Sequence, residues 1–442
     1  MSNNEIKYQL DDKMPLRENL IYACQHVIFF VASAVVMPVV VGYALGLSQP
    51  EVAQTLQRTL VLCGIISILQ TALGHRYPII DGPAGLWSGL LILMATTMTA
   101  FGKDAQILRT DLETGMIIGG GFVILLVILG LMNKLITLFS PLINGVLILL
   151  MVLQISPSIV KGMTGITADN TVIDGKSTFV FFFTMLLILF LNMYARGFIK
   201  SIATFIGVLA GWVLAWVMGI TTQADLSAGG VVSLPEVFAW GKPTFDTGVV
   251  ITCVIAAFVL LSMTFASING MAEVVEDRPD NKRFNRAVSI HGLATVLCGI
   301  FPTVAFMPYV SSTGIVKMTG VAARTPFYLA SAFMIVMGMI SPIGAFFSTI
   351  PNAVGYAALI MIYALIMGQG FNELKKVKFT NRENFIVGIS MLIGMGVMFL
   401  PTEAFSDLPQ VAGYILSNGL IDGMALAFLL EHVLLKKKKQ TP

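Results

Sequence analysis

Residues 74–87 read GHRYPIIDGPAGLW and residues 301–314 read FPTVAFMPYVSSTG, and both stretches interrupt long apolar runs. Their prolines and β-branched or aromatic residues favour extended backbone. A helix-start signal follows in each: Asp81 at an N-cap position with Pro83 in the first turn, and Ser311 or Ser312 as the N-cap of the second. The sequence therefore predicts two short extended breaks, each leading into a helix.

The composition of the 442 residues is strongly apolar: 56% are apolar, 12% are charged and the mean hydropathy is +0.85. Soluble domains are about 45–50% apolar and about 25% charged, so this class is excluded. The 29 Phe and 25 Met exclude disorder, and a net charge of +3 is too small to indicate a nucleic-acid partner. The four cysteines lie in apolar runs, which disfavours disulfides and a cysteine metal site. An all-α polytopic membrane protein remains.

Fourteen apolar stretches approach the roughly 20 residues that a helix needs to cross a membrane. The first seven lie near 18–46, 54–73, 84–101, 114–132, 134–156, 177–194 and 199–219. The second seven lie near 247–271, 287–303, 309–322, 326–346, 350–368, 384–401 and 409–435. The two breaks belong to spans 3 and 10.

The positions of the basic residues predict the orientation, because cytoplasmic loops carry more Lys and Arg. With both ends of the chain in the cytoplasm, 21 of the 27 basic residues lie inside, including Lys436–Lys439 of the tail. Six remain outside: Arg58, Lys103, Arg109, Lys161, Lys176 and Lys242. The basic tail is either a simple anchor beside anionic headgroups or a lipid-recognition switch.

The matched places of the breaks indicate an internal repeat. Spans 3 and 10 are each third in a set of seven, and an odd number of spans per half inverts the second half. Spans 5 and 12 also share a Pro-x-x-x-Gly spacing, at 141–145 and 351–355. Non-helical backbone at membrane depth is tolerated only inside protein or beside water, and two helix N-termini there would offer N–H groups to a carbonyl-rich ligand or an anion. The alternative is that both breaks are packing kinks.

At these residues the chain resembles the nucleobase–ascorbate transporter (nucleobase:cation symporter-2) family, which includes uracil and xanthine permeases. Four motifs carry the similarity: Gln25-His26 with Pro38, residues 74–79 with Gly82-Pro83, Tyr309-x₄-Gly314-x₄-Thr319, and Ser417-Asn418-Gly419-Leu420. The resemblance implies a seven-plus-seven inverted repeat with a core domain (residues 1–132 and 246–348) and a gate domain (residues 133–245 and 349–442). It also implies uptake of bases, usually with a proton, and a homodimer.

Two family positions differ in this sequence. The usual Glu-x-x-Gly of span 8 is Ser267-x-x-Gly270 here, although a shift of one residue would put Ala266 at the glutamate position. The acidic or amide pair of span 10 is replaced by Ser311 and Ser312. The chain is therefore similar to a divergent, purine-permease-like branch.

Seven residues are candidate substrate contacts: Ser267, Asn269, Ser311, Ser312, Thr313, Gly82 and Gly85. Hydroxyls and amides offer donors and acceptors to a heterocycle, but serines in membrane helices also bond their own backbone. Asp81 and His26 are candidate proton-coupling groups, since ionisable groups are costly at membrane depth. The alternatives are an N-cap role for Asp81 and a structural hydrogen bond for His26.

We expect a secondary active transporter of nucleobases, with purines such as xanthine or urate favoured, that works by alternating access in the cell's inner membrane. The expected partners are the base, a proton or another coupling ion, and the lipid bilayer. Neither a cofactor nor a metal is expected. The alternative is an anion exchanger or channel of the related sulfate-transporter-like architecture. An enzyme is disfavoured because the sequence shows neither a nucleophile–base arrangement nor metal-ligand spacing.

Overall fold

The computed structural model describes residues 6–100, 103–131, 138–166, 172–221, 230–405 and 416–436, together with 408, 412 and 413. Lys437–Lys439 of the basic tail lie outside these residues. Seven of the described helices are long and apolar enough to cross a membrane. The protein is therefore mostly helical, and its helices are of membrane-spanning character.

The helices overlap the predicted apolar stretches, with bounds that differ by several residues: α5 begins nine residues before the predicted 114–132, and α7 begins seven residues after the start of the predicted 134–156. The first half contains α1 (Leu16–Ala34), α2 (Val36–Ala44), α3 (Gln49–Ala72), β1 (Asp81–Pro83), α4 (Gly85–Ala100), α5 (Ala105–Ile128), α7 (Pro141–Thr164), α8 (Gly175–Tyr194), α9 (Gly197–Ser201) and α10 (Ala203–Val217). The second half contains α11 (Thr247–Val274), α12 (Asn281–Ile300), β2 (Phe306–Pro308), α13 (Ser312–Thr319), α14 (Arg324–Met339), α15 (Ser341–Ser348), α16 (Asn352–Lys375), α17 (Asn381–Met398) and α19 (Gly419–Leu429). A π-helical turn (Leu430–Leu434) and a 3₁₀ turn (Thr402–Phe405) complete the second half.

Of the last predicted span, 409–435, residues 409–411, 414 and 415 lie outside the described residues. Helix α19 begins only at Gly419, because the Asn418 side chain accepts a hydrogen bond from the Ile421 N–H and caps the helix. The cap belongs to the Ser-Asn-Gly-Leu motif of residues 417–420. Its asparagine thus starts α19.

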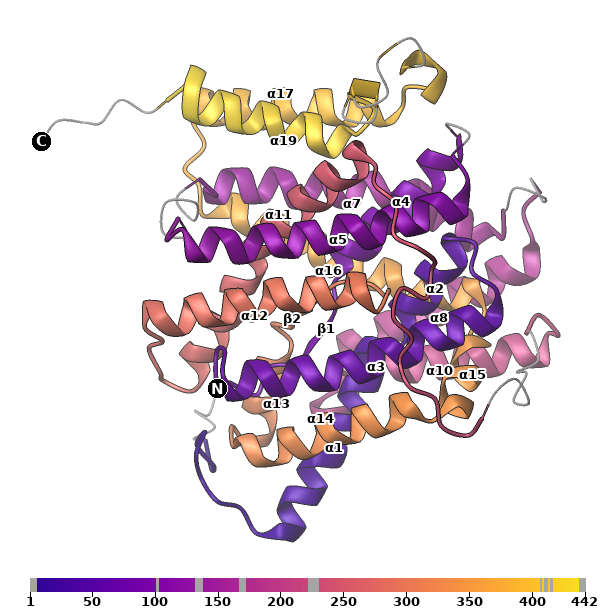
Figure 1. The fold of residues 1–442 in the computed structure, drawn as a ribbon, viewed down its shortest axis with the longest axis vertical. Helices are drawn as coiled ribbons and strands as arrows, with labels where there is room; N and C mark the ends of the chain where they lie inside the picture. The colour runs from indigo at the N-terminus through magenta and orange to yellow at the C-terminus, as the bar shows by residue number, and fades with distance from the viewer. Residues whose placement is uncertain are drawn as a thin grey trace, which may run out of the picture.

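Two short extended segments pair antiparallel near the middle of the molecule (Figure 1). Asp81 lies opposite Pro308, Gly82 opposite Met307 and Pro83 opposite Phe306. The pair packs against α3 and α1 on the β1 side and against α11 and α12 on the β2 side. Stretches more than 220 positions apart in sequence are thus neighbours in one small ladder.

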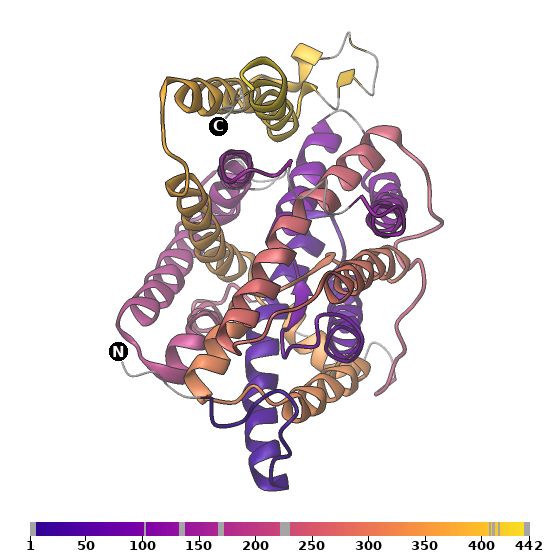
Figure 2. The same cartoon turned by 90° about the vertical axis from the view of Figure 1, so that its left-hand side faces the viewer.

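The helices around this pair are closely packed. Helix α3 packs on α14, α5 packs on both α12 and α11, and α7 packs on α16. Figures 1 and 2 show α17 and α19 at one end of the long axis, with α1 and α14 at the other. Glycines allow some of these contacts: a Cβ on Gly120 of α5 would lie 2.4 Å from the Gly292 carbonyl oxygen of α12.

The segment before α1 is fastened to the loop between α13 and α14. Tyr8 forms a parallel bridge with Val321; its N–H donates to the Gly320 carbonyl at 3.2 Å, and its carbonyl accepts from the Ala322 N–H at 2.8 Å. The Arg324 guanidinium also pairs with Asp11 at 2.5 Å. The amino-terminal segment therefore lies on the part of the chain that follows the second break.

Candidate functional site

One face of α3 carries a polar ladder that holds both extended segments. Thr59, Cys63, Ser67 and Thr71 are spaced four residues apart, so they lie on one side of the helix. The Thr59 hydroxyl bonds the Thr303 hydroxyl at 2.5 Å, and the Cys63 thiol donates to the Asp81 carbonyl at 2.8 Å. Ser67 Oγ accepts from the Asp81 N–H at 3.1 Å, and the Thr71 hydroxyl donates to the Tyr77 carbonyl at 2.9 Å.

The ladder explains how non-helical backbone is tolerated inside a helical bundle, where an unpaired N–H or C=O is costly. Neighbouring groups complete the arrangement. The Ile80 N–H donates to Ser312 Oγ at 3.1 Å, the Tyr309 N–H donates to the Ile80 carbonyl at 2.8 Å, and the Arg58 Nε donates to the Pro302 carbonyl at 3.0 Å. The paired strands β1 and β2, here called the strand crossing, thus form a platform whose backbone groups are bonded within the protein.

Asp81 and His75 form a buried pair beside this platform. Both side chains are fully buried, and His75 Nε2 lies 3.7 Å from Asp81 Oδ2. Neither carboxylate oxygen has a hydrogen-bond partner among the described residues. His75 Nδ1 accepts from the Tyr77 N–H at 3.1 Å, which puts the proton of the neutral ring on Nε2, the nitrogen that faces Asp81.

The predicted N-cap role of Asp81 is wrong. Asp81 and Pro83 belong to β1, and α4 begins two residues later, at Gly85. The extended segment runs further than the proline pattern indicated, because Asp81, Gly82 and Pro83 all pair with β2. The Asp81 side chain therefore does not cap α4, and its role in proton coupling stays a prediction.

Ser267 is fully buried and is directed at β2 rather than at open space. Its hydroxyl lies 2.6 Å from the Pro308 carbonyl oxygen and 3.0 Å from the Met263 carbonyl oxygen, either of which can accept its proton. The preceding residue, Ala266, is exposed, and so is Asn269. The structure therefore places Ala266 and Asn269, and not Ser267, on the open face of α11.

The three residues that start α13 differ in exposure. Ser312 is buried and its hydroxyl is used by Ile80, whereas Ser311 is exposed and makes no side-chain capping bond. The Thr313 hydroxyl donates to the Val310 carbonyl at 2.7 Å. The N–H groups of 312, 313 and 314 donate to the carbonyls of Tyr309, Val310 and Ser311, so the expected free donors are already paired.

The two predicted glycines permit close contacts. A Cβ on Gly82 would lie 2.8 Å from the Tyr309 hydroxyl, which donates to the Pro83 carbonyl at 2.9 Å. A Cβ on Gly85 would lie 2.8 Å from Ile366 of α16, and the Tyr363 hydroxyl donates to the Gly85 carbonyl at 2.7 Å. Gly82 therefore lies under a tyrosine ring, and Gly85 joins the start of α4 to α16.

His26 is buried in α1 and packs edge-on against Phe327, with the ring centroids 5.4 Å apart. Its Nδ1 has no hydrogen-bond partner among the described residues. The side chain that the structure places beside the Asp81 carboxylate is that of His75, for which the sequence suggested no role. The signal that could have found His75 is its place in the same break, six residues before Asp81.

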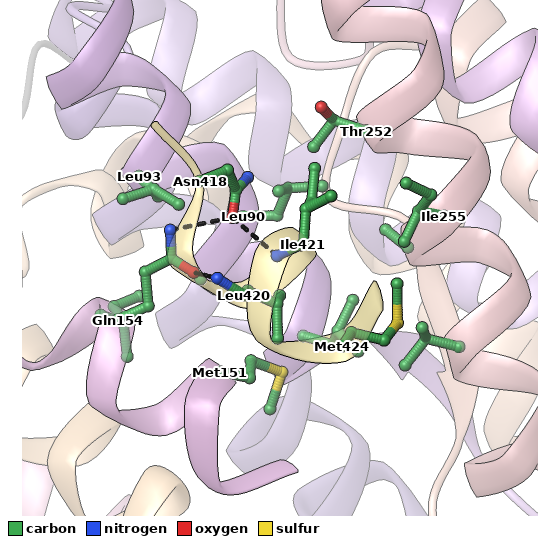
Figure 3. Close-up of a pocket in the computed structure, with 15 residues that line it drawn as sticks. Leu90, Leu93, Met151, Gln154, Thr252, Ile255, Asn418, Leu420, Ile421 and Met424 are labelled. Carbon is green, nitrogen blue, oxygen red and sulfur yellow. Dashed lines mark hydrogen bonds between the residues drawn. The ribbon is translucent and has the colours of Figure 1, made fainter. Parts of the chain in front are cut away.

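A small apolar cavity lies between α4, α7, α11 and α19 (Figure 3). At one end, Gln154 Nε2 donates to Asn418 Oδ1 at 3.0 Å, and Gln154 Oε1 accepts from the Leu420 N–H at 3.0 Å. The cavity volume is about 30 Å³, enough for a water or two. Gln154, missed at the sequence level, fastens α7 to the start of α19.

A larger cavity, of about 220 Å³, lies between α7, α11 and α16. Ser262, Ala266 and Asn269 of α11 form one wall, and Asn144 of α7 contributes another side. Of the predicted site residues, only Asn269 reaches this cavity. Those that the structure does bring together are Asp81, Gly82, Ser267 and Ser312, at the strand crossing.

The comparisons with known proteins identify the family of the chain. A sequence model described as "Permease family" matches residues 17–403. The chain is 29% identical over 429 residues to a protein of Bacillus subtilis named putative purine permease YwdJ, covering 95% of this chain and 96% of that protein. It is 26% identical to the xanthine permease of the same organism (92% of each chain) and 26% identical to the uric acid transporter UacT of Escherichia coli (91% and 83%).

Two solved structures share the fold. The transmembrane domain of the cyanobacterial bicarbonate transporter BicA superposes with a TM-score of 0.60 at 15% identity, covering 95% of this chain and 100% of that one. The murine anion transporter Slc26a9 gives 0.63 at 14% identity, covering 96% and 69%. These likenesses show the architecture of a multi-pass membrane protein. On the match over residues 17–403, the chain belongs to the permease family, the nucleobase–ascorbate transporter family that its motifs resemble.

Proposed function

We propose that this chain is a secondary active transporter of nucleobases, with purines such as xanthine or uric acid as substrates, and that it works by alternating access. The relatives named above are purine, xanthine and uric acid permeases. The observation that carries the proposal is the bonded crossing of β1 and β2, with a buried Asp–His pair on one side and an open helix face on the other. Such interrupted segments at a repeat interface are where transporters bind substrate.

The arrangement of helices supports fourteen spans in a seven-plus-seven inverted repeat. If β1 corresponds to β2, then α3 corresponds to α12 and α5 to α14. The observed pairs α3–α14 and α12–α5 then exchange under one twofold rotation, and the antiparallel β1–β2 pair lies on its axis. A core built from residues 1–132 and 246–348 would move against a gate built from 133–245 and 349–442.

In this proposal the predicted site residues divide into two groups. Ser267, Ser312 and Gly82 hold the paired strands together, and Gly85 joins the start of α4 to α16, as their contacts indicate. Asn269, Ser311 and Thr313 contact the base. The protein lies in the inner membrane with both ends in the cytoplasm, as the distribution of Lys and Arg predicts. Whether it forms a homodimer stays a prediction of the family resemblance.

The coupling ion in this proposal is a proton carried by Asp81. The carboxylate is buried without a hydrogen-bond partner among the described residues, and His75 Nε2 lies 3.7 Å from its Oδ2. A proton on Asp81 removes a buried charge, so loading it changes how β1 interacts with its surroundings. His26 is the second candidate, on weaker grounds, because Phe327 covers its ring.

The fold alone would also suit an anion exchanger, since the two solved structures named above are of a bicarbonate transporter and of an anion transporter. An anion site at α13 would need free N–H groups. The first N–H groups of α13 donate to nearby carbonyls instead. We therefore favour a base as the substrate.

The test is uptake into proteoliposomes holding the purified protein. Labelled xanthine, uric acid and uracil, each with and without a pH gradient, should show saturable uptake that unlabelled bases compete for and that the gradient accelerates. Protein-free liposomes are the control. Electrogenic chloride or sulfate flux without uptake of any base would contradict the proposal and favour the anion alternative.

A further inference from the structure

An open polar pocket lies at one end of the helices of the proposed gate, on the side assigned to the cytoplasm. The start of α7, the segment after α16, the start of α17 and the turn after α19 line it, and its volume is about 240 Å³. This space holds a polar group of several atoms rather than a single water. The proposed transport cycle makes no use of it.

The lining carries three cations and two carboxylates, and both carboxylates are already bonded within the protein. Glu431 accepts a hydrogen bond from the Ser140 hydroxyl at 2.6 Å. Glu383 accepts from the Thr380 N–H at 3.2 Å in the capping box of α17, and it pairs with Arg382 at 2.9 Å. The two acids therefore serve the ends of α7 and α17.

The remaining cations of the lining are two lysines. Lys376 pairs at 2.5 Å with Glu373, which is outside the lining. Lys378 is exposed and has neither an ion pair nor a side-chain hydrogen bond within the described part of the chain. Helix α7 begins at the same place, with Pro141 in its first turn, so the positive end of its dipole adds to the charge. The pocket therefore favours an anion.

The carboxyl end of the chain is fastened beside this pocket. Arg382 Nη2 donates to the Glu431 carbonyl at 3.0 Å, and Arg382 Nε donates to the Leu435 carbonyl. Lys436, the first of four consecutive lysines in the sequence, follows directly. Further positive charge therefore adjoins the pocket on the same side of the protein.

Exposed apolar side chains also adjoin the pocket. Phe379 follows Lys378 directly and is 44% exposed. Phe385 lies three residues after Arg382, on the same face of α17, and is 63% exposed. Neighbouring charged and apolar surfaces suit an amphiphile, whose headgroup binds in the pocket while its acyl chains lie along the two rings. A soluble phosphate would use only the pocket.

We propose that this pocket binds the headgroup of an acidic phospholipid of the inner leaflet, with the phosphate between Lys378 and the start of α7. The cytoplasmic leaflet carries acidic lipids, and basic pockets between helices on that side hold their headgroups. The lipid fastens the ends of α7, α17 and α19, all parts of the proposed gate, to the inner leaflet. This inference goes beyond base transport and is independent of which substrate is carried.

The test measures thermal unfolding of the purified full-length protein in a neutral detergent as phosphatidylglycerol is added. A ligand that binds only the folded protein raises the unfolding temperature. We expect a saturable rise with phosphatidylglycerol and none with phosphatidylcholine, which has the chains and the phosphate but no net charge. Inorganic phosphate and glycerol phosphate, which have the charge but no chains, should also give none at the same concentration.

Two variants of Lys378 test the headgroup contact. With Lys378→Gln, about fivefold more phosphatidylglycerol should be needed for half of the rise, and Lys378→Glu should abolish the rise. Because Lys378 has no bonded partner in the described part of the chain, neither change should unfold the protein. Lys282→Gln is the matched control, since Lys282 is also an exposed lysine assigned to the cytoplasmic side, but it lies in α12 and outside the lining.

Three results would overturn the proposal. The first is a wild-type response to phosphatidylglycerol in both Lys378 variants. The second is equal weakening by Lys282→Gln, which would show a general attraction between charges rather than a site. The third is an equal rise with inorganic phosphate, which would exclude the lipid as the occupant. Base uptake by the wild type tests the transport proposal separately.

Discussion

Asp81 shows how the role of a side chain depends on its neighbours in space. From sequence alone the carboxylate suited a helix cap as well as a proton site. In the structure the helix starts two residues after β1 ends, and the carboxylate faces His75 at 3.7 Å. The polar groups that bond its backbone, Ser67 and Cys63, come from α3, and within the described part of the chain the carboxylate oxygens have no hydrogen-bond donor.

Replacing Asp81 by Asn should separate substrate binding from coupling. The amide imitates the protonated acid in shape but cannot release a proton, so base binding should persist within about twofold while uptake no longer responds to pH. His75→Gln, which removes the titratable partner and keeps an N–H donor, should shift the pH response without abolishing it. Uptake by both variants is measured over a range of external pH. A wild-type pH profile for Asp81→Asn would remove the carboxylate from the coupling step.

The sequence located the two stretches, 74–87 and 301–314, that contain β1 and β2, but it did not show what each of their residues contacts. The positions of the breaks follow from proline and β-branched residues, which act locally. Whether a serine faces a cavity or a strand carbonyl depends on the rotation of α11 and α13 against their neighbours. Ser267 and Ser312 are bonded to backbone groups. Ala266, which the alternative alignment puts at the family's glutamate position, lies on the exposed face of α11.

At the scale of elements, α3 is the helix that positions the site. Its Thr59, Cys63, Ser67 and Thr71 bond groups of both breaks. The four-residue spacing is visible in the sequence, but a polar face on an apolar helix does not reveal what it touches. Only the paired strands show that these side chains replace the missing helical hydrogen bonds.

Ser67→Ala should destabilise the protein, because it leaves the buried Asp81 N–H without its partner. An unsatisfied buried donor costs about 1–3 kcal/mol, so the unfolding temperature in detergent should fall. Ser390→Ala is the matched control: Ser390 is also fully buried, but its hydroxyl has no partner among the described residues. Equal stability of the two variants would show that Ser67 does not support β1.

Gly120→Ala should weaken the contact between α5 and α12. The new Cβ would lie 2.4 Å from the Gly292 carbonyl oxygen and 2.7 Å from the Val296 nitrogen, and backbone atoms cannot move aside cheaply. Overpacking of this kind costs about 1–3 kcal/mol, which thermal unfolding would detect. At the neighbouring Gly121, a Cβ would have no atom within 4 Å, so Gly121→Ala should be neutral or slightly stabilising. If Gly121→Ala lowered the unfolding temperature more than Gly120→Ala, this result would contradict the packing of α5 on α12.

At the scale of the whole molecule, hydropathy predicted a mostly helical protein with helices of membrane-spanning character, and the proposed inverted repeat would account for the paired breaks. The sequence could not supply the contacts between halves, since α3 with α14 and α5 with α12 join segments far apart in the chain. It also missed the cavity between α7, α11 and α16, because three helices contribute to it and each supplies only a few residues.

A disulfide between the proposed core and gate should stop transport. A Cβ on Gly355 of α16 would lie 3.9 Å from the Val40 Cβ of α2, close to the spacing of natural disulfides. Val40→Cys with Gly355→Cys, in a Cys24→Ser background because Cys24 is exposed, should lose uptake on oxidation and regain it with reductant. Base binding should persist, since the protein is held in the conformation described.

The control is a disulfide inside the proposed core. A Cβ on Gly42 would lie 3.7 Å from the Val52 Cβ, which joins α2 to α3. Gly42→Cys with Val52→Cys should therefore transport normally when oxidised. If both disulfides leave uptake intact, the two domains do not move against each other at this contact.

The bridge between Tyr8 and Val321 has a practical consequence. Ala322 donates its amide proton to the Tyr8 carbonyl, and Tyr8 donates its own to Gly320, directly behind the second break. Hydrogen–deuterium exchange at these two amides would report on the region around the second break without a probe attached there. For the same reason an affinity tag should be placed at the carboxyl end, because a tag at the amino end could disturb the hydrogen bonds between Tyr8 and the residues that follow α13.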